Sequence, residues 1–361
     1  KVQKFNFAHF QYVIPLIKNK KCKYLTTIHD ILFNDFSSYF SMIYRLKRNF
    51  LFRQSAKNSD FLLTVSNYSK QAIKVKYKLH DKKIYIRKYL KKRYNTEPEF
   101  KKKLSWWVKH LKNLPSLLNL PTDNPRPLIQ SFNGRLKTLK LNIEESLIIK
   151  NFAKDTHTTP FNLILTAFSI LLHKYTGQTD LVIGIPSSTR DSDEFKVSIG
   201  PFINTLPLRI LIDDRHSFSE FIEKIKMTTT EALKRHDIPF EKIVNELKLE
   251  RSPGHSPLFQ VMLNMEPEIT TKEIHGSKIK LFSIDKQKSH FDLSLSIQTS
   301  LESFNCIFEY NTDLFCKETM DRMADHFHNI LTSLVKNPWK KITTLSLLSP
   351  KELCIQTKEW N

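Results

Sequence analysis

The residues best suited to chemistry lie in residues 199–209, which read IGPFINTLPLR. Here an amide, a hydroxyl and a guanidinium, those of Asn204, Thr205 and Arg209, stand in an apolar run that follows Gly200. Such groups hydrogen-bond to a ligand or, where buried, need partners within the protein. The two prolines of the run remove backbone donors and favour a bent or edge strand over a central one. The sequence leaves open whether this strand faces a ligand or only orders the backbone.

Two later stretches carry imidazoles, a carboxylate and guanidinium groups in short patterns. Residues 235–241 read RHDIPFE, and residues 251–261 read RSPGHSPLFQV. The candidate residues in them are His236, Asp237, Pro239, Phe240, Arg251, Pro257 and Phe259. No G-x-S-x-G sequence accompanies these histidines, so a Ser-His-Asp triad is disfavoured. The two stretches favour a scaffold over a catalytic centre.

In this order and at these spacings, the three stretches resemble the second half of a nonribosomal peptide synthetase condensation domain. The resemblance extends from about residue 95 to residue 361, and it includes LPTDNPRP at residues 120–127, which in that family bridges two lobes. It implies an α/β fold, a chloramphenicol-acetyltransferase-like C-terminal lobe. It also implies amide bond formation between carrier-protein-bound aminoacyl or peptidyl thioesters. The substrate-tunnel candidates would be Gly200, Asn204, Thr205 and Arg209, with the later stretches as scaffold.

The histidine motif of that family, HHxxxDG, has no counterpart here, because the chain contains no adjacent pair of histidines. General acid–base catalysis needs a group within hydrogen-bond reach of the transferred proton. We therefore expect an incomplete condensation domain that is inactive alone, which leaves open whether the chain is an enzyme. The resemblance implies carrier proteins and an adenylation domain as partners. It implies the phosphopantetheine arms of carrier proteins at the site, with no cofactor bound directly. A non-catalytic carrier-protein docking module is an alternative.

The first segment places further polar residues directly after β-rich runs. His29 and Asp30 end one such run and Ser66 ends the next, with helical periodicity between them. This order predicts a βαβ unit, whose functional groups lie at the carboxyl ends of its strands. The sequences TIHDILF and DFLLTVSNYSK resemble the N-terminal domain of a family 4 type glycosyltransferase. The resemblance implies a partial Rossmann-like segment over about residues 5–87, with the histidine near a sugar-transfer site.

That glycosyltransferase family also uses a second domain that binds the nucleotide sugar, and the chain does not match it. We therefore expect His29 and Asp30 to be structural, with a sugar-transfer fragment as an alternative function. The predicted organisation is a Rossmann-like segment over residues 1–87, a helix and proline-rich linker over 88–133, and a condensation-domain lobe over 134–361. The change of pattern near residues 87–95 also fits a recombined or truncated gene product.

The charge of this 361-residue chain, +21 in all, is concentrated in its first segment. Residues 1–103 hold 25 Lys and Arg against 6 Asp and Glu, whereas the remainder holds 32 against 30. Such asymmetry fits binding to nucleic acid or to an anionic membrane surface, and it equally fits a lysine-biased solvated face or two pieces of different ancestry. The lysines follow no recognition pattern, so we expect no nucleic-acid partner. No run of about 18 apolar residues predicts a membrane span. The four cysteines form no CxxC pair, which predicts free thiols without a metal, in the cytoplasm.

Periodicity and capping signals predict the elements that would position the candidate residues. Thr159 before Pro160, and Ser217 three residues before Glu220, are start signals of helices. The expected helices cover residues 39–57, 70–77, 100–114 with Trp107 buried, 143–154, 159–173, 217–234, 239–247 and 319–335. The expected strands of the second segment cover residues 134–141, 180–186, 259–265, 278–284, 293–298 and 306–310.

Overall fold

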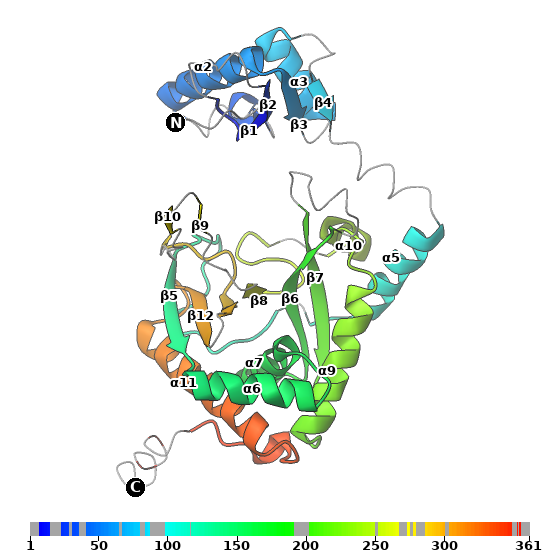
Figure 1. The fold of residues 1–361 in the computed structure, drawn as a ribbon, viewed down its shortest axis with the longest axis vertical. Helices are drawn as coiled ribbons and strands as arrows, with labels where there is room; N and C mark the ends of the chain where they lie inside the picture. Colours follow the sequence, from blue (N-terminus) through cyan, green and yellow to red (C-terminus); the bar gives the residue numbers. More distant parts are fainter. Residues whose placement is uncertain are drawn as a thin grey trace. The chain divides into compact units, whose positions relative to one another are not determined.

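The chain forms two compact units, Lys1–Phe100 and Lys101–Asn361, in the computed structural model (Figure 1). The residues that the structure describes are 7–14, 23–28, 31–35, 41–64, 67–79, 84–86, 98–115, 117–190, 202–249, 252–266, 273–274, 277–278, 286–299, 303–348, 352 and 354. Within these ranges, no helix is long and apolar enough to cross a membrane. The domain limits near residues 87 and 133 stay predictions.

The first unit is built on a parallel sheet of four strands in sequence order. The strands are β1 (Phe7–Gln11), β2 (Lys23–Thr27), β3 (Phe61–Thr64) and β4 (Ile84–Ile86). Each strand pairs in parallel with the next. The helices between them are α1 (Leu32–Asp35), α2 (Met42–Asn58) and α3 (Asn67–Tyr77). The predicted strand–helix–strand order is therefore present. Parallel neighbouring strands require such a crossover connection.

The core of the first unit forms where α2 and α3 meet β3. Phe52 and Ala56 of α2, Leu62 of β3 and Ile73 of α3 are all buried. Ser41 caps α2 by accepting a hydrogen bond from the Tyr44 backbone N–H (3.3 Å). The opposite face of α2 stays exposed.

The second unit is built on a six-stranded mixed sheet with the order β5-β12-β11-β8-β6-β7. Its strands are β5 (Gly134–Lys140), β6 (Asp180–Ser188), β7 (Ile203–Leu211), β8 (Val261–Glu266), β11 (Leu293–Thr299) and β12 (Phe304–Asn311). β8 pairs in parallel with both β6 and β11, and the other pairs are antiparallel. β7 lies at an edge of this sheet, as the prolines of residues 199–209 predict. A short antiparallel pair is formed by β9 (Glu273–Ile274) and β10 (Ser277–Lys278). Of the strand expected over residues 278–284, only Lys278 is among the described residues, and it lies in β10.

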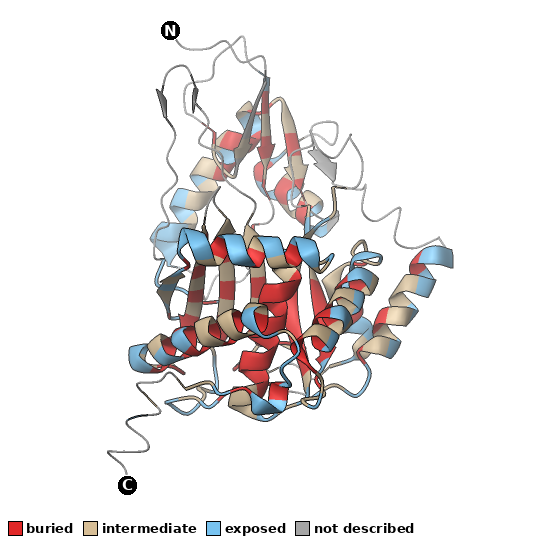
Figure 2. Ribbon diagram, turned by 60° about the horizontal axis from the view of Figure 1, so that its bottom comes forward, coloured by how far each residue is buried: buried red, intermediate tan, exposed pale blue. Residues whose placement is uncertain are grey.

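Six helices and a short 3₁₀ turn accompany this sheet in the described residues. They are α5 (Pro98–His110), α6 (Ile143–Asp155), α7 (Pro160–Thr176), α9 (Phe218–Leu233), α10 (Phe240–Leu247), α11 (Lys317–Lys336) and a 3₁₀ turn (Ile342–Thr344). α7 contacts α6, α9 and α11, and all of its residues from Asn162 to His173 are buried. Figure 2 shows this helix as a nearly continuous buried segment in the second unit. Thr159 caps its start, as predicted, and Gly177, at φ +70°, ends it.

Two details differ from or refine the sequence expectations. α5 ends at His110 rather than near residue 114, because the chain turns at Asn113, which has a φ of +57°. The described cysteines, Cys306, Cys316 and Cys354, are free thiols. Burial raises the pKa of Cys306 to about 12, so this thiol stays protonated and unreactive.

Candidate functional site

Asn204 joins the first predicted stretch to the second. It stands near the start of β7, on the same strand face as the buried Leu206 and Leu208. Its amide nitrogen donates to the backbone oxygens of His236 (2.8 Å) and Ile238 (2.6 Å). Its side-chain oxygen accepts the Phe240 backbone N–H (3.0 Å). The amide therefore satisfies three backbone groups in the turn that leads into α10.

The second and third stretches meet through aromatic rings. The ring of Phe240, at the start of α10, lies 5.5 Å from that of Phe259, which in turn stacks on Phe291 at 5.4 Å. A Cβ atom placed on Gly184 of β6 would lie only 2.3 Å from the Phe259 ring. Glycine at this position therefore lets the ring pack directly against the β6 backbone. The three sequence stretches converge on one packed junction.

Arg209 is a structural clamp at the far end of β7. It makes a bidentate ion pair with Asp180 of β6 (3.0 and 2.7 Å). Its remaining terminal nitrogen donates to the backbone oxygens of His110 (2.8 Å) and Lys112 (3.1 Å) at the end of α5. Hydrogen bonding to Asp180 raises the pKa of Arg209. The guanidinium thus ties two strands to a helix C-terminus, where a positive charge is favourable.

α5 is held against the turn between α9 and α10. Trp107 is fully buried, as predicted, and its indole N–H donates to the Arg235 backbone oxygen (3.2 Å). The Arg235 guanidinium lies 4.1 Å from the Trp106 ring, which stacks on His110. Burial lowers the pKa of His110, and the charges of Arg209 and Arg235 lower it further.

Asp237 of the second stretch also contributes to this contact. It forms an ion pair with Lys103 of α5 (3.1 Å). Pro239 precedes α10, and its backbone oxygen accepts the Lys242 N–H (2.9 Å). His236 places its Nδ1 2.7 Å from the Leu233 backbone oxygen. These contacts order the turn.

The proline-rich linker is bound to Asp292 by an ion pair and to Gln260 of the third stretch by a hydrogen bond. Arg126 contacts both carboxylate oxygens of Asp292, whose side chain is only 3% exposed. Gln260, also buried, accepts the Leu118 backbone N–H (2.9 Å) and donates to the Ser256 oxygen (3.0 Å). The linker is therefore an integral part of the second unit.

The remaining candidate residues fall into two groups. Thr205 is half-buried opposite Pro186, and the Pro257 backbone oxygen accepts the Phe259 N–H (3.0 Å). The candidates outside the described residues are Gly200, Arg251, His29, Asp30 and Ser66. Sequence reasoning missed the partners Asp180, Lys103 and Asp292, because no local pattern links residues so far apart in the chain.

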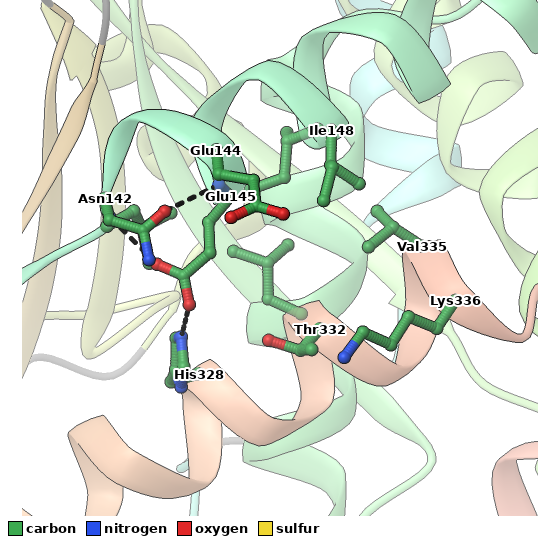
Figure 3. Close-up of a pocket in the computed structure, with 11 residues that line it drawn as sticks. Asn142, Glu144, Glu145, Ile148, His328, Thr332, Val335 and Lys336 are labelled. Carbon is green, nitrogen blue, oxygen red and sulfur yellow. Dashed lines mark hydrogen bonds and ion pairs between the residues drawn. The ribbon is translucent and has the colours of Figure 1, made fainter.

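A hollow of about 260 Å³ lies between α6 and α11 (Figure 3). The Glu145 carboxylate on α6 lies 2.7 Å from His328 Nε2 on α11. Glu145 also forms a capping box with Asn142, which the N-x-x-E spacing could have indicated. The apolar lining includes Leu141, Ile148, Ile149, Leu331 and Val335. Capping and interhelical pairing engage these polar groups, and none of the candidate residues that the structure describes lines the hollow.

A partly buried chain of polar side chains connects α7 to α11. The Tyr175 hydroxyl lies 2.7 Å from His326 Nδ1, and His326 Nε2 lies 3.2 Å from a Glu352 carboxylate oxygen. Burial raises the pKa of Tyr175 to about 12. The phenol is therefore neutral at physiological pH and links two helices.

Comparisons with known proteins agree with this architecture. A family model described as the condensation domain matches residues 64–353. A linear gramicidin synthase of Brevibacillus parabrevis is 33% identical over 350 residues, which cover 96% of this chain and 6% of the synthase. Gramicidin S synthase 2 of Brevibacillus brevis is 34% identical over 254 residues, 70% of this chain and 6% of the synthase. The chain thus spans a small part of these relatives.

Solved structures show the same fold. A four-domain nonribosomal peptide synthetase bound to AMP and glycine matches with a TM-score of 0.68 and 24% identity, over 74% of this chain and 22% of that one. The X-domain from teicoplanin biosynthesis matches with a TM-score of 0.63 and 24% identity, over 71% of this chain and 59% of that one. With the family model matching most of the chain, these findings show that the protein belongs to the condensation-domain family of nonribosomal peptide synthetases.

Proposed function

We propose that the second unit acts as the C-terminal lobe of a condensation domain and forms no peptide bond by itself. The family reaction joins two carrier-bound thioesters as an acceptor amine attacks a donor acyl carbon. In this proposal the junction around β7 and α10 supplies one rigid wall of the reaction chamber. The proton-handling histidine pair would come from a first lobe on another chain or segment.

The observation that carries this proposal is the full structural use of Asn204 and Arg209. Both donors of the Asn204 amide and its oxygen bind backbone groups. The Arg209 guanidinium binds the Asp180 carboxylate and two backbone oxygens at the end of α5. Groups held in this way shape a wall, whereas a general base needs a free lone pair facing the substrate.

The histidines of the recognised stretches also fit a scaffold role. His236 places Nδ1 2.7 Å from the Leu233 backbone oxygen, and His255 places Nδ1 3.1 Å from the Ser256 backbone oxygen. The sequence has no adjacent histidines. The proposed partners are therefore carrier proteins with their phosphopantetheine arms, an adenylation domain and a complementary first lobe.

A complementation assay tests the proposal. The chain is mixed with donor- and acceptor-loaded carrier proteins, with and without a separately produced first lobe that carries HHxxxDG. We expect dipeptide only when that lobe is added, and none when its second motif histidine is replaced by alanine. Dipeptide formed by the chain alone would contradict the proposal. Retention of carrier protein without dipeptide in any mixture would favour a docking module instead.

The parallel sheet of the first unit supports a second, separate candidate function. β2 and β3 are parallel neighbours, so their carboxyl ends lie at one edge of the sheet, as in doubly wound folds. His29, Asp30 and Ser66 follow these strands in the sequence, outside the described residues. Sugar transfer by this unit requires nucleotide-sugar binding. Titration calorimetry with common uridine and guanosine diphosphate sugars tests it, and the absence of binding heat would reject this function.

A further inference from the structure

Helix α2 has two apolar faces, and only one of them is used within the first unit. Phe52 and Ala56 point into the core. Ile43, Leu46 and Phe50 are 79%, 60% and 64% exposed. Their spacing of three and four residues aligns them as one stripe on the helix. At 100° per residue, this stripe lies opposite Phe52, so it faces away from the core.

Basic residues flank the stripe. α2 contains five Lys and Arg and no acidic residue. Lys47 follows Ile43 by four positions and Arg53 follows Phe50 by three, so both border the exposed apolar side chains. The surrounding segment is strongly basic, with 25 Lys and Arg against 6 Asp and Glu in residues 1–103. An apolar stripe with cationic borders is typical of helices that lie in a lipid interface.

We propose that this face of α2 binds the surface of a membrane containing anionic lipids. Ile43, Leu46 and Phe50 would enter the boundary between headgroups and acyl chains, and Lys47 and Arg53 would contact the negatively charged headgroups. The helix lies on the surface and does not span it, since its 17 residues include five cations. The inference concerns the first unit and is independent of the proposed condensation function.

Charge and geometry favour a lipid surface over other occupants. Nucleic acids are bound mainly through phosphate contacts to Lys and Arg, yet the centre of this face is apolar. A second copy of the chain would bring two helices together, each with five positive charges and none negative. An anionic lipid surface complements both the charge and the apolar stripe.

Vesicle flotation with the full chain tests the proposal. We expect binding to vesicles with about 30% phosphatidylserine and little binding to pure phosphatidylcholine, because each Lys or Arg near an anionic surface adds favourable energy. Binding should weaken as salt is raised, because counterions screen the surface charge. Phe50→Glu and Leu46→Glu should each lower the partition coefficient at least about tenfold, since each removes an exposed apolar side chain that would enter the membrane.

Met227→Glu is the matched control. Met227 lies on α9 in the second unit and is 68% exposed. Its replacement by Glu adds the same charge and removes an exposed apolar side chain, as Phe50→Glu and Leu46→Glu do. This variant should bind within about twofold of the parent chain, because it leaves the stripe intact. Circular dichroism spectra that match the parent confirm that the variants are folded.

Four outcomes would overturn the inference. They are no binding to either vesicle, equal binding to both, binding by Phe50→Glu equal to that by Met227→Glu, and a dimer in solution that Phe50→Glu dissociates. The last would assign the stripe to a second copy of the chain. Retention on DNA or RNA in place of vesicles would likewise reject the membrane surface.

Discussion

Asn204 can bind three backbone groups at once because its short side chain carries two donors and one acceptor. The groups belong to a turn more than 30 positions away in the sequence, so the side chain fixes how that turn meets β7. Phe240, whose N–H is one of the three groups, then places its ring against Phe259.

Replacing Asn204 should therefore destabilise the second unit. Asn204→Ala leaves three partly buried backbone groups without their partner, and we expect it to lower the free energy of unfolding by about 1–3 kcal/mol. Urea denaturation followed by tryptophan fluorescence measures this change.

Asn204→Asp is the informative comparison. It keeps an acceptor for the Phe240 N–H but removes both donors and sets a carboxylate against two carbonyl oxygens. We expect a loss at least as large as that of alanine. An aspartate variant as stable as the parent chain would show that the two donated hydrogen bonds contribute little.

At the scale of elements, the linker is joined to the start of α11. Asp123 accepts the Cys316 backbone N–H (2.8 Å) and the Thr319 hydroxyl (2.8 Å). Slight burial raises the pKa of Asp123, but these hydrogen bonds outweigh it and hold the pKa below its usual value. A carboxylate at this position also complements the positive end of the helix dipole.

Stability should depend on pH through this carboxylate. Because its pKa is lower in the folded chain, its contribution is present above its unfolded pKa of about 4 and is lost as the pH falls through the folded pKa. Asp123→Asn should cost about 1 kcal/mol at neutral pH. Urea midpoints of parent and variant should converge in acid. A gap that stays constant from neutral to acidic pH would contradict the assignment.

Elements could be predicted well from the sequence, whereas their contacts could not. The Thr159 cap, the Ser217 capping box and the edge position of β7 follow from local chemistry, and the structure confirms them. The partner of Arg209 could not be predicted, since any acidic residue satisfies the same charge. The same limit applied to Asn204, for which both a structural and a ligand-facing role fit the sequence pattern. Only the folded register distinguishes them.

At the scale of the whole molecule, the two units have separate cores. Leu62 is fully buried in the first unit, and Leu171 is fully buried in the second. All four tryptophans, Trp106, Trp107, Trp339 and Trp360, belong to the second unit. Tryptophan fluorescence therefore reports on the second unit, whereas circular dichroism reports on both.

The units should unfold in separate transitions. Leu171→Ala should lower the free energy of unfolding measured by fluorescence by about 2–5 kcal/mol, because it leaves a cavity in the core around α7. Leu62→Ala should leave the fluorescence midpoint unchanged. It should shift only the circular dichroism transition that comes from the first unit. If both variants moved the fluorescence midpoint, the chain would unfold as one cooperative body.

The open sheet of the second unit also has a consequence for aggregation. In the described sheet, β5 and β7 are the outer strands, and such strands can recruit further strands from neighbouring molecules. β5 carries Arg135 and Lys140, whose like charges repel another copy, and β7 carries Pro207, which has no backbone N–H to donate to an added strand. Both outer strands thus disfavour the addition of further strands, so this sheet can keep two open edges without forming fibrils.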